Sequence, residues 1–181
     1  MTEVNLYNGL DEFSYNCIKF LMNNNELIWK LLYYSDANAW RDDASHPSLD
    51  MSQKGSLIFD GINPETNYRV FMDFGLDDVW NSEACILRIA PVDVIPDNNY
   101  IGKVIMGFEV YCHSQMNTMS NYKTRTMMIM EQLIQTFNNQ AVAGLGRMFF
   151  DASIYSRCRI SPIGRIPYKG RSLTMCNWSS V

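Results

Sequence analysis

The two histidines, His46 and His113, are the only imidazoles of the 181-residue chain that could act as general acids, general bases or metal ligands. Cys112 directly precedes His113, and a cysteine beside an imidazole can be an activated nucleophile. Both fall in an alternating stretch that predicts a strand, where neighbouring side chains point to opposite faces. We therefore expect Cys112 to be a structural thiol. His46 precedes Pro47 in a polar segment without a partner at ligand spacing, so we expect a surface histidine.

Pairs of aspartates occur at Asp42-Asp43 and Asp77-Asp78. A two-metal nuclease would need such carboxylates to converge on a cleft. Adjacent aspartates in loops are more typical of solvated turns, and no lysine or histidine motif accompanies these. The sequence therefore predicts no catalytic residues, no metal site and no cofactor, and a magnesium-dependent nuclease remains as the enzymatic alternative.

The last third of the chain is basic and interleaved with tyrosine and tryptophan. Arginine and aromatic faces together suit single-stranded nucleic acid, so a small nucleic-acid-binding module that uses the basic C-terminal strands is the runner-up function. The acidic pI of about 5.1 favours a protein–protein contact or a solvated strand face instead. The candidate residues for contacts between subunits are Lys123, Arg125, Arg157, Arg159, Arg165, Lys169 and Arg171.

Lys123 and Arg125 lie in the first turn of a predicted helix, where the helix dipole disfavours cations. Such a position requires an acidic partner. We expect this partner to be Asp73 or Glu109 of the predicted sheet, or the acidic half of a neighbouring copy.

Charge is distributed unevenly along the chain. Residues 1–90 hold 14 acidic and 6 basic side chains, a net charge of −8, whereas residues 91–181 hold 5 acidic and 9 basic ones, a net charge of +4. Opposite patches on one small protein can attract a copy of itself. The composition, 47% hydrophobic and 19% charged, fits a folded domain, and the scattered cysteines fit reduced thiols. Since no apolar run is long enough to span a bilayer and no signal peptide is evident, we expect an intracellular, soluble protein.

Periodicity divides the chain into predicted elements. Asn8 could begin a first helix that ends at residues 23–25, and Asn25 could cap a second helix over Glu26–Tyr34. Apart from a short element at Ser56–Asp60, residues 35–67 lack periodicity. The predicted strands cover Tyr68–Phe74, a Cys85–Ile95 and Lys103–His113 hairpin, Arg147–Ile160, and a second hairpin, Arg165–Tyr168 and Arg171–Trp178, that turns at Lys169-Gly170. A long helix runs from Ser120 to Phe137, and Gly144 and Gly146 are expected to follow its end.

This order predicts an α+β fold: an antiparallel or mixed sheet, a long helix packed on one face, and two short N-terminal helices. We expect a single domain over residues 1–181, with N-terminal helices in 1–34, a long irregular connection in 35–67, and a sheet-and-helix core in 68–178. Long irregular connections inside a compact domain are often functional.

Four stretches in order resemble the neck and tail-completion proteins of tailed bacteriophages, which include head–tail connector rings and tail terminators. They are Asn25–Tyr34 (NELIWKLLYY), Gly107–His113 (GFEVYCH) followed by the helix with Arg125, Gly144–Phe150 (GLGRMFF), and Tyr168–Met175 (YKGRSLTM). The similarity is to a structural protein of the crAss-like or podophage type.

This resemblance implies a tail-terminator-like fold and a virion protein of the neck or tail, assembled in the host cytoplasm. Its partners would be six or twelve copies of itself in a ring, the adjacent portal, neck and tail proteins, and genomic DNA that passes through the lumen without sequence-specific binding. No membrane is implied. The connection Ser35–Asn67 and the predicted Lys169-Gly170 hairpin would then contact adjoining rings.

Overall fold

The computed structural model describes residues 12–61, 67–73, 83–96, 101–150, 157–159 and 168–180, the last two ranges by their backbone. Its helices are α1 (Glu12–Asn24), α2 (Glu26–Tyr33), α3 (Met51–Ser56) and α4 (Arg125–Phe137). Its strands are β1 (Val70–Phe71), β2 (Cys85–Pro96), β3 (Ile101–His113), β4 (Ala141–Val142), β5 (Gly146–Phe149), β6 (Arg157–Arg159) and β7 (Tyr168–Ser180).

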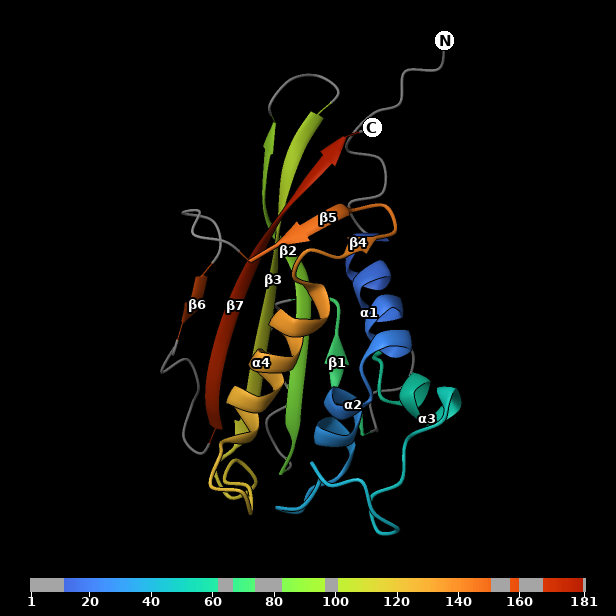
Figure 1. Ribbon diagram of the computed structural model, residues 1–181, viewed down its shortest axis with the longest axis vertical. Coiled ribbons are helices and arrows are strands. Elements are labelled where there is room, and N and C mark those ends of the chain that lie inside the picture. The colour runs from blue at the N-terminus through green and yellow to red at the C-terminus, as the bar shows by residue number, and fades with distance from the viewer. Residues whose placement is uncertain are drawn as a thin grey trace.

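The strands form one seven-stranded sheet in the order β1-β2-β3-β7-β5-β4, with β6 also paired to β7. The β1–β2 pair is parallel and the other pairs are antiparallel, so the sheet is mixed. The α+β class is confirmed. The long strands β2, β3 and β7 form the centre, β1 lies at one side of the sheet, and β6 lies at the other (Figure 1).

Three helices cover one face of this sheet, with α1 and α2 over β2 and α4 over β3 and β7 (Figure 1). Side chains from the helices and from alternate strand positions meet in the main core, among them Trp29, Leu87 and Phe108. On α4, Met130, Leu133 and Phe137 are buried and Ile134 is partly buried against that core. The predicted apolar face of this helix is confirmed.

The N-terminal half follows the predicted order. The Asn25 side chain accepts a hydrogen bond from the Ile28 amide at 2.9 Å and caps α2, as its position before the helix predicts. Position 8 lies outside the described residues. The short element in the connection is helix α3, which shares only Ser56 with the predicted Ser56–Asp60 because a capping box of Asp50 and Gln53 begins it earlier. Strand β1 is only two residues long.

The β2–β3 hairpin is confirmed, but the predicted C-terminal hairpin is wrong. Lys169 and Gly170 lie inside the continuous strand β7, where they pair with Cys112 and Tyr111 of β3. Pairing with β3 continues on both sides of Lys169 and Gly170, so these residues stay extended although their local sequence favours a turn. The predicted strand Arg147–Ile160 is likewise divided into β5 and β6, which pair with two separate parts of β7.

Helix α4 begins five residues later than predicted. Asn117 satisfies its first donors, since its carbonyl accepts from the Arg125 amide at 2.7 Å and its side chain accepts from the Thr126 amide at 3.2 Å. The helix ends at Asn138, followed by Asn139 with a φ of 61°. Gly144 and Gly146, with φ of 76° and 70°, serve the β4–β5 turn and not the helix end.

Candidate assembly site

Arg125 is fully buried at the start of α4 and binds backbone carbonyls from one distant segment and from one nearby residue. Its guanidinium donates to the carbonyls of Leu31, Tyr34, Ser35 and Asp36, which lie at the end of α2 and just beyond it, and to that of Met116. The five distances lie between 2.5 and 3.2 Å. A cation suits the carbonyl end of a helix. Arg125 therefore fixes the start of residues 35–50, which connect α2 with α3 and are called the clasp loop below.

The expected acidic partner of Arg125 is thus replaced by carbonyl oxygens, and its burial removes it from the candidate subunit contacts. Asp73 pairs with Arg88 at 3.2 Å, and Glu109 accepts a hydrogen bond from the Tyr111 hydroxyl at 2.7 Å. Lys123 does have an acidic partner, Glu131 of its own chain, at 3.5 Å. Both of these side chains are about half exposed, so this pair is weak.

His46 closes the clasp loop by bridging two aspartates. Its Nε2 lies 2.9 Å from Asp36 Oδ2 and its Nδ1 lies 2.9 Å from Asp43 Oδ1. These hydrogen bonds, first to Asp36 and then to Asp43, raise the pKa of His46 above its ordinary 6.5. Burial works to raise the pKa of Asp36, but hydrogen bonds from His46 and the Asn38 amide outweigh it and lower that pKa. His46 is buried rather than a surface residue, contrary to the prediction.

Two buried lysines fix this region: Lys30 ties the clasp loop to α2, and Lys54 ties α3 to α1 and α2. The Lys30 ammonium donates to the Arg41 carbonyl and lies 3.4 Å from Asp42 Oδ1. The Lys54 ammonium lies 2.7 Å from Glu26 Oε2 and donates to the Met22 carbonyl at 3.1 Å. A buried charge is costly unless it is paired, so these contacts favour one conformation. The predicted irregular connection is held in place.

A second, shorter loop over residues 118–124, called the Tyr122 loop, presents an aromatic side chain to solvent. Tyr122 is 98% exposed and has a φ of 62°, a left-handed conformation that is strained for a tyrosine. Its amide donates to the Met119 carbonyl at 3.0 Å, and the Met119 amide donates to the Lys123 carbonyl at 2.9 Å. Strained backbone persists only where its surroundings enforce it, and it is frequent at functional sites.

The clasp loop and the Tyr122 loop lie side by side at one end of the molecule, at the bottom of Figure 1. The Ser120 amide donates to the Ala37 carbonyl at 2.9 Å, and the Trp40 indole donates to the Ser120 hydroxyl at 3.0 Å. At this end the clasp loop exposes the carboxylates of Asp36, Asp42 and Asp43, and the Tyr122 loop exposes Tyr122. This pre-formed end is suited to contact another protein, because little backbone order remains to be lost on binding.

The family model described as YomW matches residues 25–175 of the chain. The chain belongs to the YomW family. This family is of a phage-derived, SPbeta prophage-like type, so the protein is phage-associated. Among curated proteins, none matches the chain. The matched range includes the clasp loop, the Tyr122 loop and all of α4.

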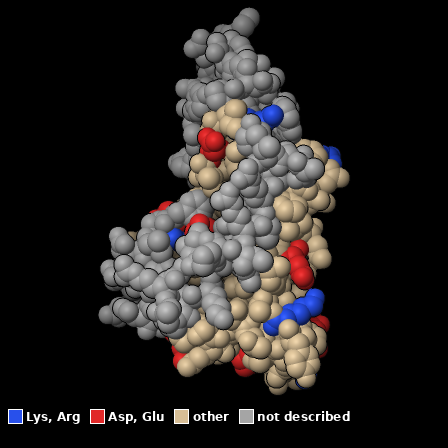
Figure 2. All heavy atoms as spheres, turned by 90° about the vertical axis from the view of Figure 1, so that its left-hand side faces the viewer, with Lys and Arg blue, Asp and Glu red and all other residues tan. Residues whose placement is uncertain are grey.

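In this YomW family member, the backbone shows where most of the remaining basic residues that are candidates for subunit contacts lie. Arg157 and Arg159 lie in β6, on the side of the sheet opposite β1, while Lys169 and Arg171 lie in β7, and Arg165 lies outside the described residues. The described surface on the β6 side carries separate acidic and basic patches, with no continuous band of either sign (Figure 2).

Cys112, which the sequence predicts to be a structural thiol, and His113 are neighbours at the end of β3. Cys112 is fully buried and lies opposite Cys85 across the β2–β3 ladder, while His113 follows on the strand. A hydrogen bond with Cys85, together with burial, raises the pKa of the Cys112 thiol, which disfavours the thiolate. Across the described part of the YomW family chain, no group of His, Cys, Asp and Glu side chains is arranged to hold a metal ion. None of its described helices is both long and apolar enough to cross a bilayer.

The sequence did not predict the roles of Arg125, Lys30, Lys54 and Tyr122. One signal was present: a cation at the start of α4 indicates an unusual environment. The two lysines fall within segments of ordinary helical composition, and nothing in the local sequence marks Tyr122.

Proposed function

We propose that this phage-associated protein is a structural virion protein that assembles with copies of itself into a ring in the phage neck. The ring would join the head to the tail around the DNA channel, without enzymatic activity. The protein's partners would be copies of itself and the adjacent neck proteins. Membership of a phage-derived family supports the phage setting.

One observation carries this proposal. Helix α3 and strand β1 lie at one side of the sheet, flanked in the chain by the exposed Asp50, Asp60 and Asp73, whereas β6, which contains Arg157 and Arg159, lies at the other (Figure 1). A ring of identical copies requires two different, complementary surfaces on each subunit. Acidic residues next to α3 and β1 and basic residues of β6 would offer two such surfaces without a second protein.

The rigid end supplies a second surface. The clasp loop lies within the connection that the resemblance assigns to contacts between adjoining rings, and Arg125, His46 and Lys30 hold it in one conformation. An adjacent neck protein would then bind this end with a small entropic cost.

The charge-paired ring is tested by the double substitution Arg157→Glu and Arg159→Glu. Rim charges govern association and its salt dependence, so this variant should form fewer rings while the monomer stays folded. Raising the salt concentration should weaken the wild-type ring in the same direction, because exposed charges are screened beyond a Debye length of about 8 Å at physiological ionic strength. The readout is mass photometry across a salt series, with circular dichroism as the check on folding.

The matched control is the double substitution Lys19→Glu and Arg41→Glu. Both side chains are exposed and belong to the acidic half, so this variant has the same net charge as the first but a more acidic α1 and clasp-loop surface. It should assemble at least as well as the wild type. If the two variants behave alike, the contact between acidic and basic sides is contradicted.

A further inference from the structure

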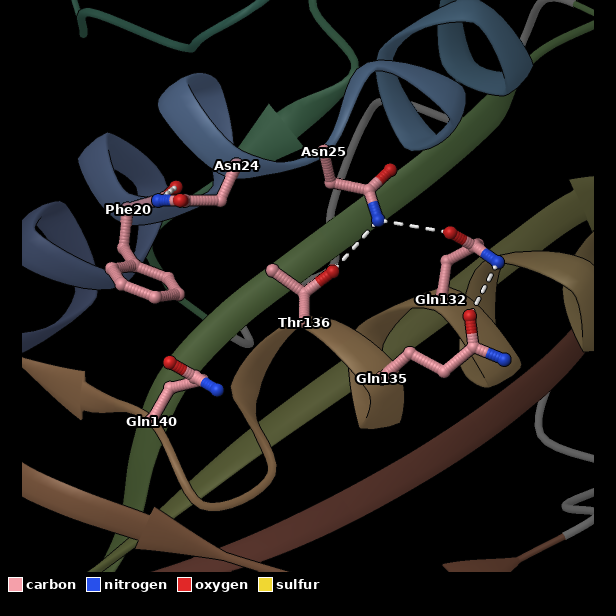
Figure 3. Close-up of a pocket in the computed structure, with 7 residues that line it drawn as sticks. All are labelled: Phe20, Asn24, Asn25, Gln132, Gln135, Thr136 and Gln140. Atoms are coloured by element: carbon pink, nitrogen blue, oxygen red, sulfur yellow. Dashed lines mark hydrogen bonds between the residues drawn. The ribbon is translucent and has the colours of Figure 1, made fainter.

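An uncharged pocket lies between the α1–α2 junction and the C-terminal half of α4. It has a volume of about 390 Å³, and its lining consists of one phenyl ring, one hydroxyl and five carboxamides: Phe20, Thr136, Asn24, Asn25, Gln132, Gln135 and Gln140. They come from α1, from Asn25 between α1 and α2, from α4 and from Gln140 just after it, and the side chains of Asn25, Gln132 and Thr136 point toward one another (Figure 3). This volume lies near the lower end of the range for ligand pockets, roughly 300–1,000 Å³, so the pocket has room for a small ligand such as a single side chain.

The amides of the pocket are partly ordered by one another. Asn25 Nδ2 donates to Gln132 Oε1 at 3.0 Å and to Thr136 Oγ1 at 2.7 Å, and Gln132 Nε2 donates to Gln135 Oε1 at 2.9 Å (Figure 3). The Phe20 ring packs against Phe137 at 5.5 Å between centroids and is therefore fixed. The best-matched ligand is neutral, has an aromatic ring for Phe20, and has a group that can both donate and accept hydrogen bonds. A tyrosine side chain has all three properties.

Tyr122 is such a side chain, held outward on a strained and hydrogen-bonded loop. It cannot enter the pocket of its own chain. It lies before the start of α4, whereas Gln132, Gln135 and Thr136 lie 7 to 11 residues into that helix, about 10–16 Å away at 1.5 Å per residue. Any tyrosine supplied by this loop must therefore come from another copy.

We propose that Tyr122 of one copy inserts into the amide-lined pocket of the next copy, and that this contact anchors the ring. The inference rests on the proposed function and deepens it. The Tyr122 loop follows the end of β3 that pairs with the start of β7, whereas the pocket lies on the side of α4 that faces α1 and α2. Tyr122 and the pocket thus lie on different surfaces of the subunit, so their contact between copies would be heterologous.

The contact is tested by association and by site-specific crosslinking of the full chain. Tyr122→Ala should weaken self-association about 30-fold or more, the loss expected for a buried aromatic anchor. Tyr122→Phe keeps the ring and loses the hydroxyl, so it should weaken association roughly threefold to tenfold. Tyr33→Ala is the matched control, since Tyr33 is 43% exposed on α2 and lines no part of the pocket. This control should leave association unchanged.

For crosslinking, p-benzoyl-phenylalanine replaces Tyr122, and isotope-labelled and unlabelled copies are mixed before illumination. Crosslinked peptides between copies should contain pocket residues of α1, Asn25, α4 or Gln140. Rings that form normally with Tyr122→Ala, or crosslinks that map elsewhere, would overturn this contact and leave the ring proposal standing. A chain that is monomeric both in solution and in phage particles would overturn the ring and the contact together.

Discussion

Replacing Arg125 by methionine is expected to destabilise the fold strongly. The side chain is fully buried and its guanidinium satisfies five backbone carbonyls. The carbonyls of Ser35 and Asp36 belong to exposed residues that water can reach, whereas the bonds to Met116 and Leu31 are buried. An unpaired buried carbonyl costs about 1–3 kcal/mol. Two buried carbonyls without a donor would lower the free energy of unfolding by about 2–6 kcal/mol. Removing one partner of a buried charged contact typically costs about 3–5 kcal/mol, and we expect a loss in this range.

The assay is urea denaturation followed by tryptophan fluorescence, with limited proteolysis of the clasp loop as a local readout. Arg125→Lys keeps the charge but has three donors for five acceptors, so it should lose about half as much free energy. Arg41→Met is the control, because Arg41 is an exposed arginine of the same loop and should change stability by less than about 0.5 kcal/mol. If Arg125→Met is as mild as this control, the reasoning about buried carbonyls is refuted.

Two further predictions concern the core and the clasp. Leu133→Ala should cost about 2–5 kcal/mol in urea denaturation, since Leu133 is fully buried on α4; a loss near that of exposed Gln135→Ala would contradict the packing. Because folding raises the pKa of His46, its contribution to stability is complete below pH 6.5 and is lost as the pH rises through the pKa of the folded state. Because folding lowers the pKa of Asp36, the contribution of Asp36 to stability is lost only at acidic pH, below 3.8. After correction for the intrinsic pH dependence of amide exchange, the clasp loop should therefore be better protected at about pH 6 than at about pH 8. His46→Gln should remove this difference in protection.

The sequence predicts the parts of the fold that repeat over many residues. The apolar stripe of α4, the Asn25 cap and the alternation in β2 and β3 each depend on local spacing, and the structure has them where the spacing places them. The Lys169-Gly170 turn fails for the opposite reason. Its local signal competes with the β3 ladder, which only the folded sheet supplies.

The candidate site is harder to predict from the sequence because its contacts join residues that are far apart in the chain. Arg125 binds residues about ninety positions earlier, and Tyr122 acquires its left-handed backbone from a loop that is fixed by Ala37 and Trp40 of another segment. Periodicity does not encode either contact. The charge asymmetry, by contrast, is a property of composition. The structure places β1 of the acidic half at one side of the sheet and β6 of the basic half at the other, while α4 and β4 of the basic half pack against α2 and α1.

The most direct test of the ring is to count this protein in purified particles of the phage that encodes it. Quantitative mass spectrometry with an isotope-labelled standard gives the number of copies per particle. A neck ring predicts a fixed number, six or twelve copies per virion, that is retained after nuclease treatment and density-gradient purification. Absence from purified particles, or a copy number that varies between preparations, would contradict a structural role in the neck.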